Sequence, residues 1–183
     1  GKVAEATICY TADVLDDKRD SYGINYYLNL ARELEKRGAH ILAIKDMSGV
    51  LRPYSAFKLV KALKEETGMP IQVHTHDTSG NQVAMALMAA QAGADIVDTA
   101  ISSMSSLTSQ PSLNAVVAAL EHTDRATGID LDSLQTLTDY WAVARAIYCD
   151  FESDMKTPAT DIYRYEIPGG QYTNLGPQVK SLG

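Results

Sequence analysis

Two histidines and a lysine are the residues of this sequence whose types and spacing could do metal chemistry. His74 and His76 stand two residues apart in the run VHTHDTSG. Alternate side chains of a β-strand point to the same face, so both imidazoles can reach one ion. The alternative is a strand-edge pair of histidines satisfied by hydrogen bonds, and the spacing alone does not decide between the two interpretations.

Lys45 is the second clue, because it follows the apolar run HILAI and precedes DMSG. A lysine in an otherwise apolar strand is costly unless its charge is paired or removed. Asp46 or Asp98 could pair with it, or its stem could reach solvent. On the sequence around Lys45 alone, these explanations are sufficient.

The position of Lys45 relative to the histidines adds a third explanation. If the two strands are neighbours, all three side chains lie at the same end of the sheet, where a dication would repel a protonated amine. The lysine would then be neutral, or converted to an anion by reaction of its amine with carbon dioxide. The resulting carbamate is an oxygen ligand, and oxygen with imidazole ligands suits Zn²⁺, Mn²⁺ or Co²⁺.

The elements that must position these residues alternate between strand and helix. Their parallel pairing and right-handed crossovers predict an α/β fold of about four βα units. Half of a TIM-type barrel and most of a doubly wound sheet are both compatible, and each builds sites at the carboxyl ends of its strands. We expect strands at 5–10, 40–46, 70–76 and 94–100, and helices at 20–37, 54–67, 80–92 and 111–121, the last with Pro111 in its first turn.

The alternation of strands and helices ends after about residue 123, so we divide the chain into the α/β part at 1–123 and the extension at 124–183. Residues 130–151 have the pattern of one long amphipathic helix capped by Asp130, and a polar connector follows at 152–160. The tyrosine-rich segment 161–175, broken by Pro-Gly-Gly, predicts an ordered loop or short strands.

Composition excludes several classes of protein. The chain has 183 residues, 45% of them hydrophobic, and a net charge of -7. It lacks the basic stripe of a nucleic-acid-binding protein and the long apolar run of a membrane span. The first residues lack signal-peptide features, so we expect the sequence to begin in the middle of a domain. Cys9 and Cys149 predict reduced, packed thiols rather than a disulfide.

Four ordered motifs closely resemble the carboxyltransferase domain of pyruvate carboxylases. They are IKDMSGVLRPY, VHTHDTSGNQ, DTAISSMSSLTSQPS and EIPGGQYTNL, and the resemblance covers essentially the whole chain. ICYTADVLDD and IYRYEIPGGQYTNL favour pyruvate carboxylase over related subunits. Ser48 departs from the usual KDMAG pattern of the family, which leaves Lys45 unaffected.

The resemblance implies an eight-stranded barrel of which this chain is the second half, followed by the start of a helical extension. It implies that Lys45, as N6-carboxylysine, and His74 and His76 bind a divalent metal. The fourth ligand, the groups that grip pyruvate and a proton-shuttling threonine belong to parts of the family pattern outside the 183 residues. We therefore assign no catalytic residue within this chain.

The same resemblance implies transfer of the carboxyl group of carboxybiotin to pyruvate, giving oxaloacetate. Biotin would be carried on another domain, and ATP and bicarbonate would be used by another domain. The enzyme would be a homo-oligomer, a tetramer by resemblance, in a bacterial cytoplasm or a mitochondrial matrix, with no nucleic-acid or membrane partner. On its own, this length of chain is expected to be inactive.

Three other functions stay open. One is an oxaloacetate decarboxylase α subunit or a transcarboxylase subunit, which would use the same metal ligands. Another is a metal-dependent aldolase related to acyl-CoA lyases, which also place an H-x-H strand in a barrel; Lys45 counts against it. The last is a non-catalytic half-barrel module, because an open half-barrel exposes strand edges and apolar surface.

Further residues are weaker candidates. Met47 and Ser48 would line the mouth of a metal site or simply pack. Asp77 could orient a histidine or cap the next helix. The serine-rich loop 102–112 could contact substrate or biotin, or only form the entry to the next helix. The segment 166–175 could pack the extension against the barrel or take part in a subunit contact, and we favour packing. His40 and His122 are interpreted as surface or capping residues.

Overall fold

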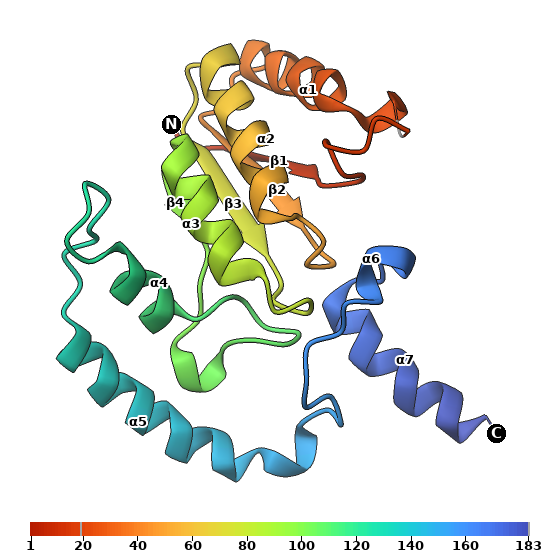
Figure 1. The fold of residues 1–183 in the computed structure, drawn as a ribbon, viewed down its shortest axis with the longest axis vertical. Helices are drawn as coiled ribbons and strands as arrows, with labels where there is room; N and C mark the ends of the chain where they lie inside the picture. The colour runs from red at the N-terminus through yellow and green to blue at the C-terminus, as the bar shows by residue number, and fades with distance from the viewer. Residues whose placement is uncertain (19, 183) are drawn as a thin grey trace.

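A parallel sheet covered by helices forms the first two thirds of the chain. The computed structural model describes residues 1–18 and 20–182, and within them four strands pair in the order β1-β2-β3-β4, all parallel (Figure 1). The α/β prediction is therefore confirmed, with one βα unit following another. The strands are β1 Glu5–Cys9, β2 Ile41–Asp46, β3 Ile71–Thr75 and β4 Ile96–Val97.

A helix follows each strand, as parallel pairing requires. Figure 1 shows α1, α2 and α3 side by side along the sheet, and α4 after the last strand. A single turn of 3-10 helix precedes α1, at Asp20–Tyr22, and a second, Ser102–Met104, lies in the serine-rich loop. The helices are α1 Ile24–Lys36, α2 Pro53–Glu66, α3 Gln82–Ala92 and α4 Leu113–Leu120.

The two faces of the sheet differ in burial. Along β3, Val73 and Thr75 are fully buried, whereas His74 between them is only partly buried. In β2, Ile44 is buried and Lys45 is exposed. Because side chains alternate along a strand, the buried set faces the helices and the other set shares the opposite face. Burial of each large aliphatic side chain stabilises the fold by roughly 1.5–3 kcal/mol.

The core between sheet and helices is made of large aliphatic side chains that are completely inaccessible to solvent. They include Leu42 and Ile44 of β2, Val73 of β3, and Leu59 and Leu63 of α2. This continuous apolar layer holds β2 and β3 rigidly, which matters because those strands carry the candidate metal ligands.

The C-terminal part is helical. The long helix α5, Leu131–Ile147, begins at Asp130, whose carboxylate accepts a hydrogen bond from Ser133 N at 2.8 Å, so the predicted cap is confirmed. The helix ends earlier than expected, and a 3-10 turn at Cys149–Phe151 follows. Two more helices, α6 Ile162–Tyr165 and α7 Gly169–Ser181, complete the chain.

The prediction of a loop or short strands at residues 161–175 was wrong, because α6 and α7 occupy most of that segment. Tyrosine favours strands, but Ile162 is 1% exposed and belongs to the main core, so packing decides the conformation. Pro168 directly precedes the first residue of α7, where its fixed φ and missing N–H are compatible with a helix start.

Three smaller expectations also need correction. The fourth strand is only Ile96–Val97, and Ala100 forms an isolated parallel bridge with Ser112. Pro111 lies before α4 rather than in it, and Ser112 caps that helix by accepting from Ala115 N. Cys9 and Cys149 are free, as predicted, but both are exposed instead of packed.

Within the described residues, none of the helices combines the length and the apolar character needed to cross a bilayer.

Candidate metal centre

Lys45 and His74 lie directly beside each other in the register of β2 and β3. His76 follows His74 by two residues, so it lies on the same face of the sheet. This is the face away from the helices, where Lys45 is exposed and both histidines are partly buried. The structure thus places the three predicted side chains together at the carboxyl ends of adjacent strands.

Each histidine uses its Nδ1 atom in a hydrogen bond. His74 Nδ1 lies 2.8 Å from Asp98 Oδ2, and His76 Nδ1 lies 2.7 Å from the carbonyl oxygen of Thr108. A carbonyl oxygen and a carboxylate oxygen only accept, so both Nδ1 atoms carry the proton. In the neutral imidazoles the free lone pair is therefore on Nε2, the atom left for a metal ion. The two rings lie edge to face, with centroids 5.4 Å apart.

Lys45 is not neutralised by either aspartate that the sequence suggested. Asp46 points to the opposite face of the sheet, and Asp98 is engaged by His74 and Gln72. Among the residues that the structure describes, the amine of Lys45 has no hydrogen-bond or ion-pair partner. The amine is accessible to solvent, and so to dissolved carbon dioxide.

Asp46 organises the loop behind Lys45. Its buried carboxylate accepts hydrogen bonds from the backbone N–H groups of Gly49, Val50 and Leu51 and from the hydroxyl of Thr75. Burial raises the pKa of the Asp46 carboxyl, and these four donors counteract that effect. The network ties the turn after β2 to β3.

Gly49 allows this turn to approach the histidine strand closely. Its φ is +74°, and a Cβ atom there would lie 2.2 Å from the carbonyl oxygen of His76. Gln82, fully buried, donates to the carbonyl of Gly49 at 2.9 Å. Only glycine fits both the conformation and the space.

The C-terminal segment packs against the same loops, as expected for residues 166–175. Gly169 N donates to Met47 O at 3.1 Å, and Ser48 Oγ donates to Glu166 O at 2.7 Å. Gly169 also lies so near Thr78 that an added Cβ would be 3.1 Å from its hydroxyl oxygen. Met47 and Ser48 therefore link β2 to the C-terminal helices.

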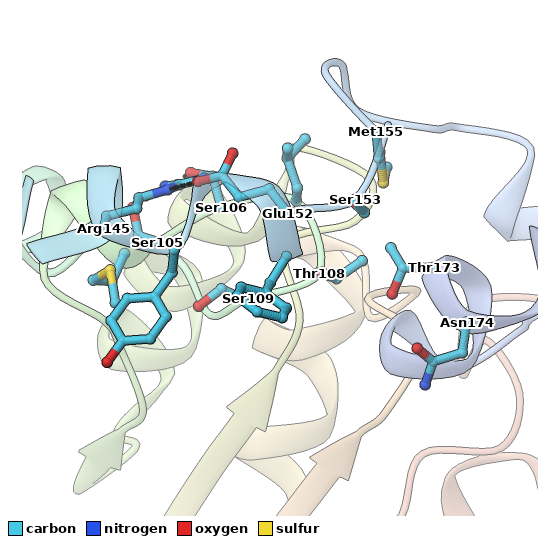
Figure 2. Close-up of a pocket in the computed structure, with 14 residues that line it drawn as sticks. Ser105, Ser106, Thr108, Ser109, Arg145, Glu152, Ser153, Met155, Thr173 and Asn174 are labelled. Atoms are coloured by element: carbon cyan, nitrogen blue, oxygen red, sulfur yellow. Dashed lines mark hydrogen bonds and ion pairs between the residues drawn. The ribbon is translucent and has the colours of Figure 1, made fainter. Parts of the chain in front are cut away.

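A pocket of about 540 Å³ adjoins the serine-rich loop (Figure 2). Thr108, whose carbonyl holds His76, lines it together with Thr173 of α7, and Arg145 and Glu152 form an ion pair at its wall. Its volume is within the range of small-ligand sites. The loop 102–112 thus contributes both to the histidine geometry and to this pocket.

Asp77 and Asp98 have different roles at this end of the sheet, and the capping alternative given for Asp77 agrees with its contact. Asp77 accepts from Gln82 N, the first residue of α3, so it caps that helix, and burial raises the pKa of its carboxyl. Asp98 holds His74 and was considered only as a partner for Lys45. Its position directly after a strand beside the H-x-H strand was the signal that could have revealed it. His40 accepts from Ala4 N, in agreement with a structural role.

The donor set fits a divalent ion in part. Within residues 1–18 and 20–182, no group of three or more His, Cys, Asp or Glu side chains could hold a metal. The two Nε2 atoms are borderline ligands suited to Zn²⁺, Mn²⁺ or Co²⁺, and Lys45 becomes an oxygen ligand only as a carbamate. The fit thus depends on modification of Lys45.

Comparison with known proteins gives the family. The model of the HMGL-like family matches residues 14–140, and the chain belongs to this family. It is 52% identical over its whole length to pyruvate carboxylase of Bacillus subtilis (strain 168) and 47% identical to mitochondrial pyruvate carboxylase of Homo sapiens. The chain spans 16% of the length of these relatives.

Solved structures agree with this. The carboxyl transferase domain of Rhizobium etli pyruvate carboxylase, solved with pyruvate, is 51% identical and superposes with a TM-score of 0.98 over the whole chain, which covers 31% of that domain's chain. The same domain has been solved with pyruvate and biocytin, with a TM-score of 0.97. The four βα units are therefore a fragment of the HMGL-like TIM-type barrel, as predicted, and not a doubly wound sheet.

Proposed function

We propose that this chain is part of the carboxyltransferase domain of a pyruvate carboxylase, a biotin-dependent ligase. The reaction moves the carboxyl group of carboxybiotin to pyruvate. A methyl C–H bond of pyruvate breaks, a C–C bond to the carboxyl carbon forms, and the proton replaces the carboxyl group on biotin, giving oxaloacetate and free biotin. The similarity to pyruvate carboxylases along the whole chain supports this activity.

The observation that carries the proposal is the grouping of Lys45, His74 and His76 on one face of β2 and β3. The two imidazoles would hold a Zn²⁺, Mn²⁺ or Co²⁺ ion through Nε2. Lys45 would contribute a carbamate oxygen, after its neutral amine forms an N–C bond to carbon dioxide and releases a proton. The ion, when bound, supplies Lewis-acid charge that favours proton loss from a keto acid.

None of these three side chains needs to transfer a proton to or from the substrate. His74 and His76 present their lone pairs from fixed rings, and Asp98 and Thr108 hold those rings. The pocket beside Thr108 is where this chain would contact substrate or the biotin ring. The groups that grip pyruvate would belong to the first half of the barrel.

We also propose that residues 1–123 are the second half of the barrel and 124–183 the start of the extension. The exposed apolar side chains of α5 and the turn after it support further protein packed there: Val143 is 71%, Ile147 75% and Phe151 86% exposed. A biotin-carrying domain, a domain that uses ATP and bicarbonate, and assembly into a homotetramer follow from the same assignment. The enzyme would act in a bacterial cytoplasm or a mitochondrial matrix.

Oxaloacetate formation from pyruvate in the intact polypeptide that contains this chain tests the proposal. His74→Ala and His76→Ala should each reduce the rate by more than the roughly 10–100-fold typical of changes around a metal ligand. His40→Ala, which alters a histidine before the start of β2, away from the site, should leave the rate unchanged. Pyruvate-dependent turnover that survives loss of both site histidines would refute the proposed site.

A further inference from the structure

We propose that Asp98 is the positioning residue for His74: its carboxylate holds the imidazole with Nδ1 protonated and Nε2 free for the metal, and Gln72 fixes the carboxylate in turn. The inference rests on the proposed function, because it assigns a role toward the same metal centre. Asp98 and Gln72 would act on the ligand His74, and neither would touch the ion.

The sheet brings Asp98 to His74. Asp98 directly follows β4, and its backbone N–H donates to the carbonyl of Val73 at 3.0 Å, which continues the pairing of β3 with β4. His74 is the next residue of β3. The Nδ1 to Oδ2 distance of 2.8 Å is that of a strong, charge-assisted hydrogen bond. Both side chains are about 30% exposed, at 28% and 31%.

Gln72 restrains the carboxylate from the other side. It stands two residues before His74, on the same face of β3. Its Nε2 atom lies 3.2 Å from each of the two oxygens of Asp98. An amide that donates across both oxygens fixes the plane of the carboxylate, so Oδ2 stays directed at His74. The hydrogen bonds therefore run from the Gln72 amide to the Asp98 carboxylate, and the same carboxylate accepts from the His74 imidazole.

His76 is held differently, and this difference makes the inference testable. Its Nδ1 donates to the backbone carbonyl of Thr108, which no side-chain substitution removes. The tautomer of His74 depends on one side chain. Substitution of Asp98 should therefore disturb one ligand of the centre and leave the other in place.

The expected effect is on metal affinity and on the tautomer, without a change of fold. In the intact polypeptide, Asp98→Ala should raise the Zn²⁺ dissociation constant, measured by chelator competition, about 10–100-fold. In the metal-free protein labelled with ¹⁵N-histidine, the His74 signals should change from a single Nδ1–H form to a mixture of tautomers. Comparison with His74→Gln identifies these signals.

Three further variants separate positioning from structure. Asp95→Ala removes a carboxylate next to the same strand, one that pairs with Lys64, and should change neither readout. Asp98→Asn keeps the volume and removes the charge, so it should weaken zinc binding with the fold intact. Asp98→Glu, which retains a carboxylate, should restore at least part of the affinity.

A zinc dissociation constant within about twofold of wild type in both Asp98→Ala and Asp98→Asn would overturn the inference, and so would an unchanged His74 spectrum. Failure of the proposed function is distinguished by His74→Ala: if that variant keeps full zinc affinity, the metal centre itself is wrong. A tautomer change in Asp98→Ala without weaker zinc binding would likewise reject the role toward the metal.

Discussion

Lys45 and His74 are direct partners in the register of two parallel strands, on the face of the sheet that the helices leave open. A lysine next to a histidine pair is an unusual metal site, because a protonated amine repels a dication. The unpartnered state of this amine among the described residues, with Asp46 and Asp98 both engaged elsewhere, is what makes the carbamate chemically reasonable.

The carbamate gives the first prediction. Intact polypeptide incubated with ¹³C-bicarbonate should show a carbamate signal that disappears in Lys45→Ala and in Lys45→Arg, since a guanidinium does not form one under these conditions. Lys61→Ala, which removes an exposed lysine of α2, should retain the signal. Persistence of the full signal in Lys45→Ala would place the modification elsewhere.

Gly49 gives a prediction with a matched control. Gly49→Ala should destabilise the fold and weaken metal binding, because its Cβ would lie 2.2 Å from His76 O and must displace the ligand strand. Gly38→Ala has a similar positive φ, +87°, with nothing within 4 Å, so it should show only the backbone strain of about 1–2 kcal/mol. Chemical denaturation and zinc titration of the two variants measure the difference. Equal effects on metal affinity would argue against the close approach.

Asp46 should be essential for stability although it touches no candidate ligand. Asp46→Asn places an amide N–H₂ group among four donors, so at least one buried hydrogen bond is lost, with an expected loss of about 2–4 kcal/mol in unfolding free energy. Asp139→Asn, on the exposed face of α5, removes the same charge and should change stability by less than about 0.5 kcal/mol. A loss as small as that of Asp139→Asn would show that the loop holds without the carboxylate.

Ser48 is the residue that departs from the family pattern KDMAG, and the structure gives it a contact. Ser48→Ala removes the hydrogen bond to Glu166 O and should lower the unfolding free energy by about 1 kcal/mol. Zinc affinity should stay the same, because the bond lies behind the loop and not at Nε2. A large drop in zinc affinity in Ser48→Ala would mean that docking of the C-terminal segment controls the site.

The sequence predicted the βα units well, because periodicity depends on local pattern, whereas the metal-binding role of the three site residues stays a prediction. Lys45, His74 and His76 could be grouped from strand order alone. Asp98 was not grouped with them, because its contact with His74 depends on how the two-residue strand β4 pairs with β3. The helix α6 was missed for a similar reason: burial of Ile162 in a core formed by distant residues overrides the strand preference of the nearby tyrosines.

The central claim is that Lys45, His74 and His76 bind one divalent ion, and metal content measured by mass spectrometry tests it most directly. The intact polypeptide should retain about one equivalent of metal after dialysis, as a structural or catalytic site with three protein ligands does. Lys45→Ala, His74→Ala and His76→Ala should each lose most of it, and His40→Ala should keep it. Full metal content in the site variants, with the fold intact, would contradict the account.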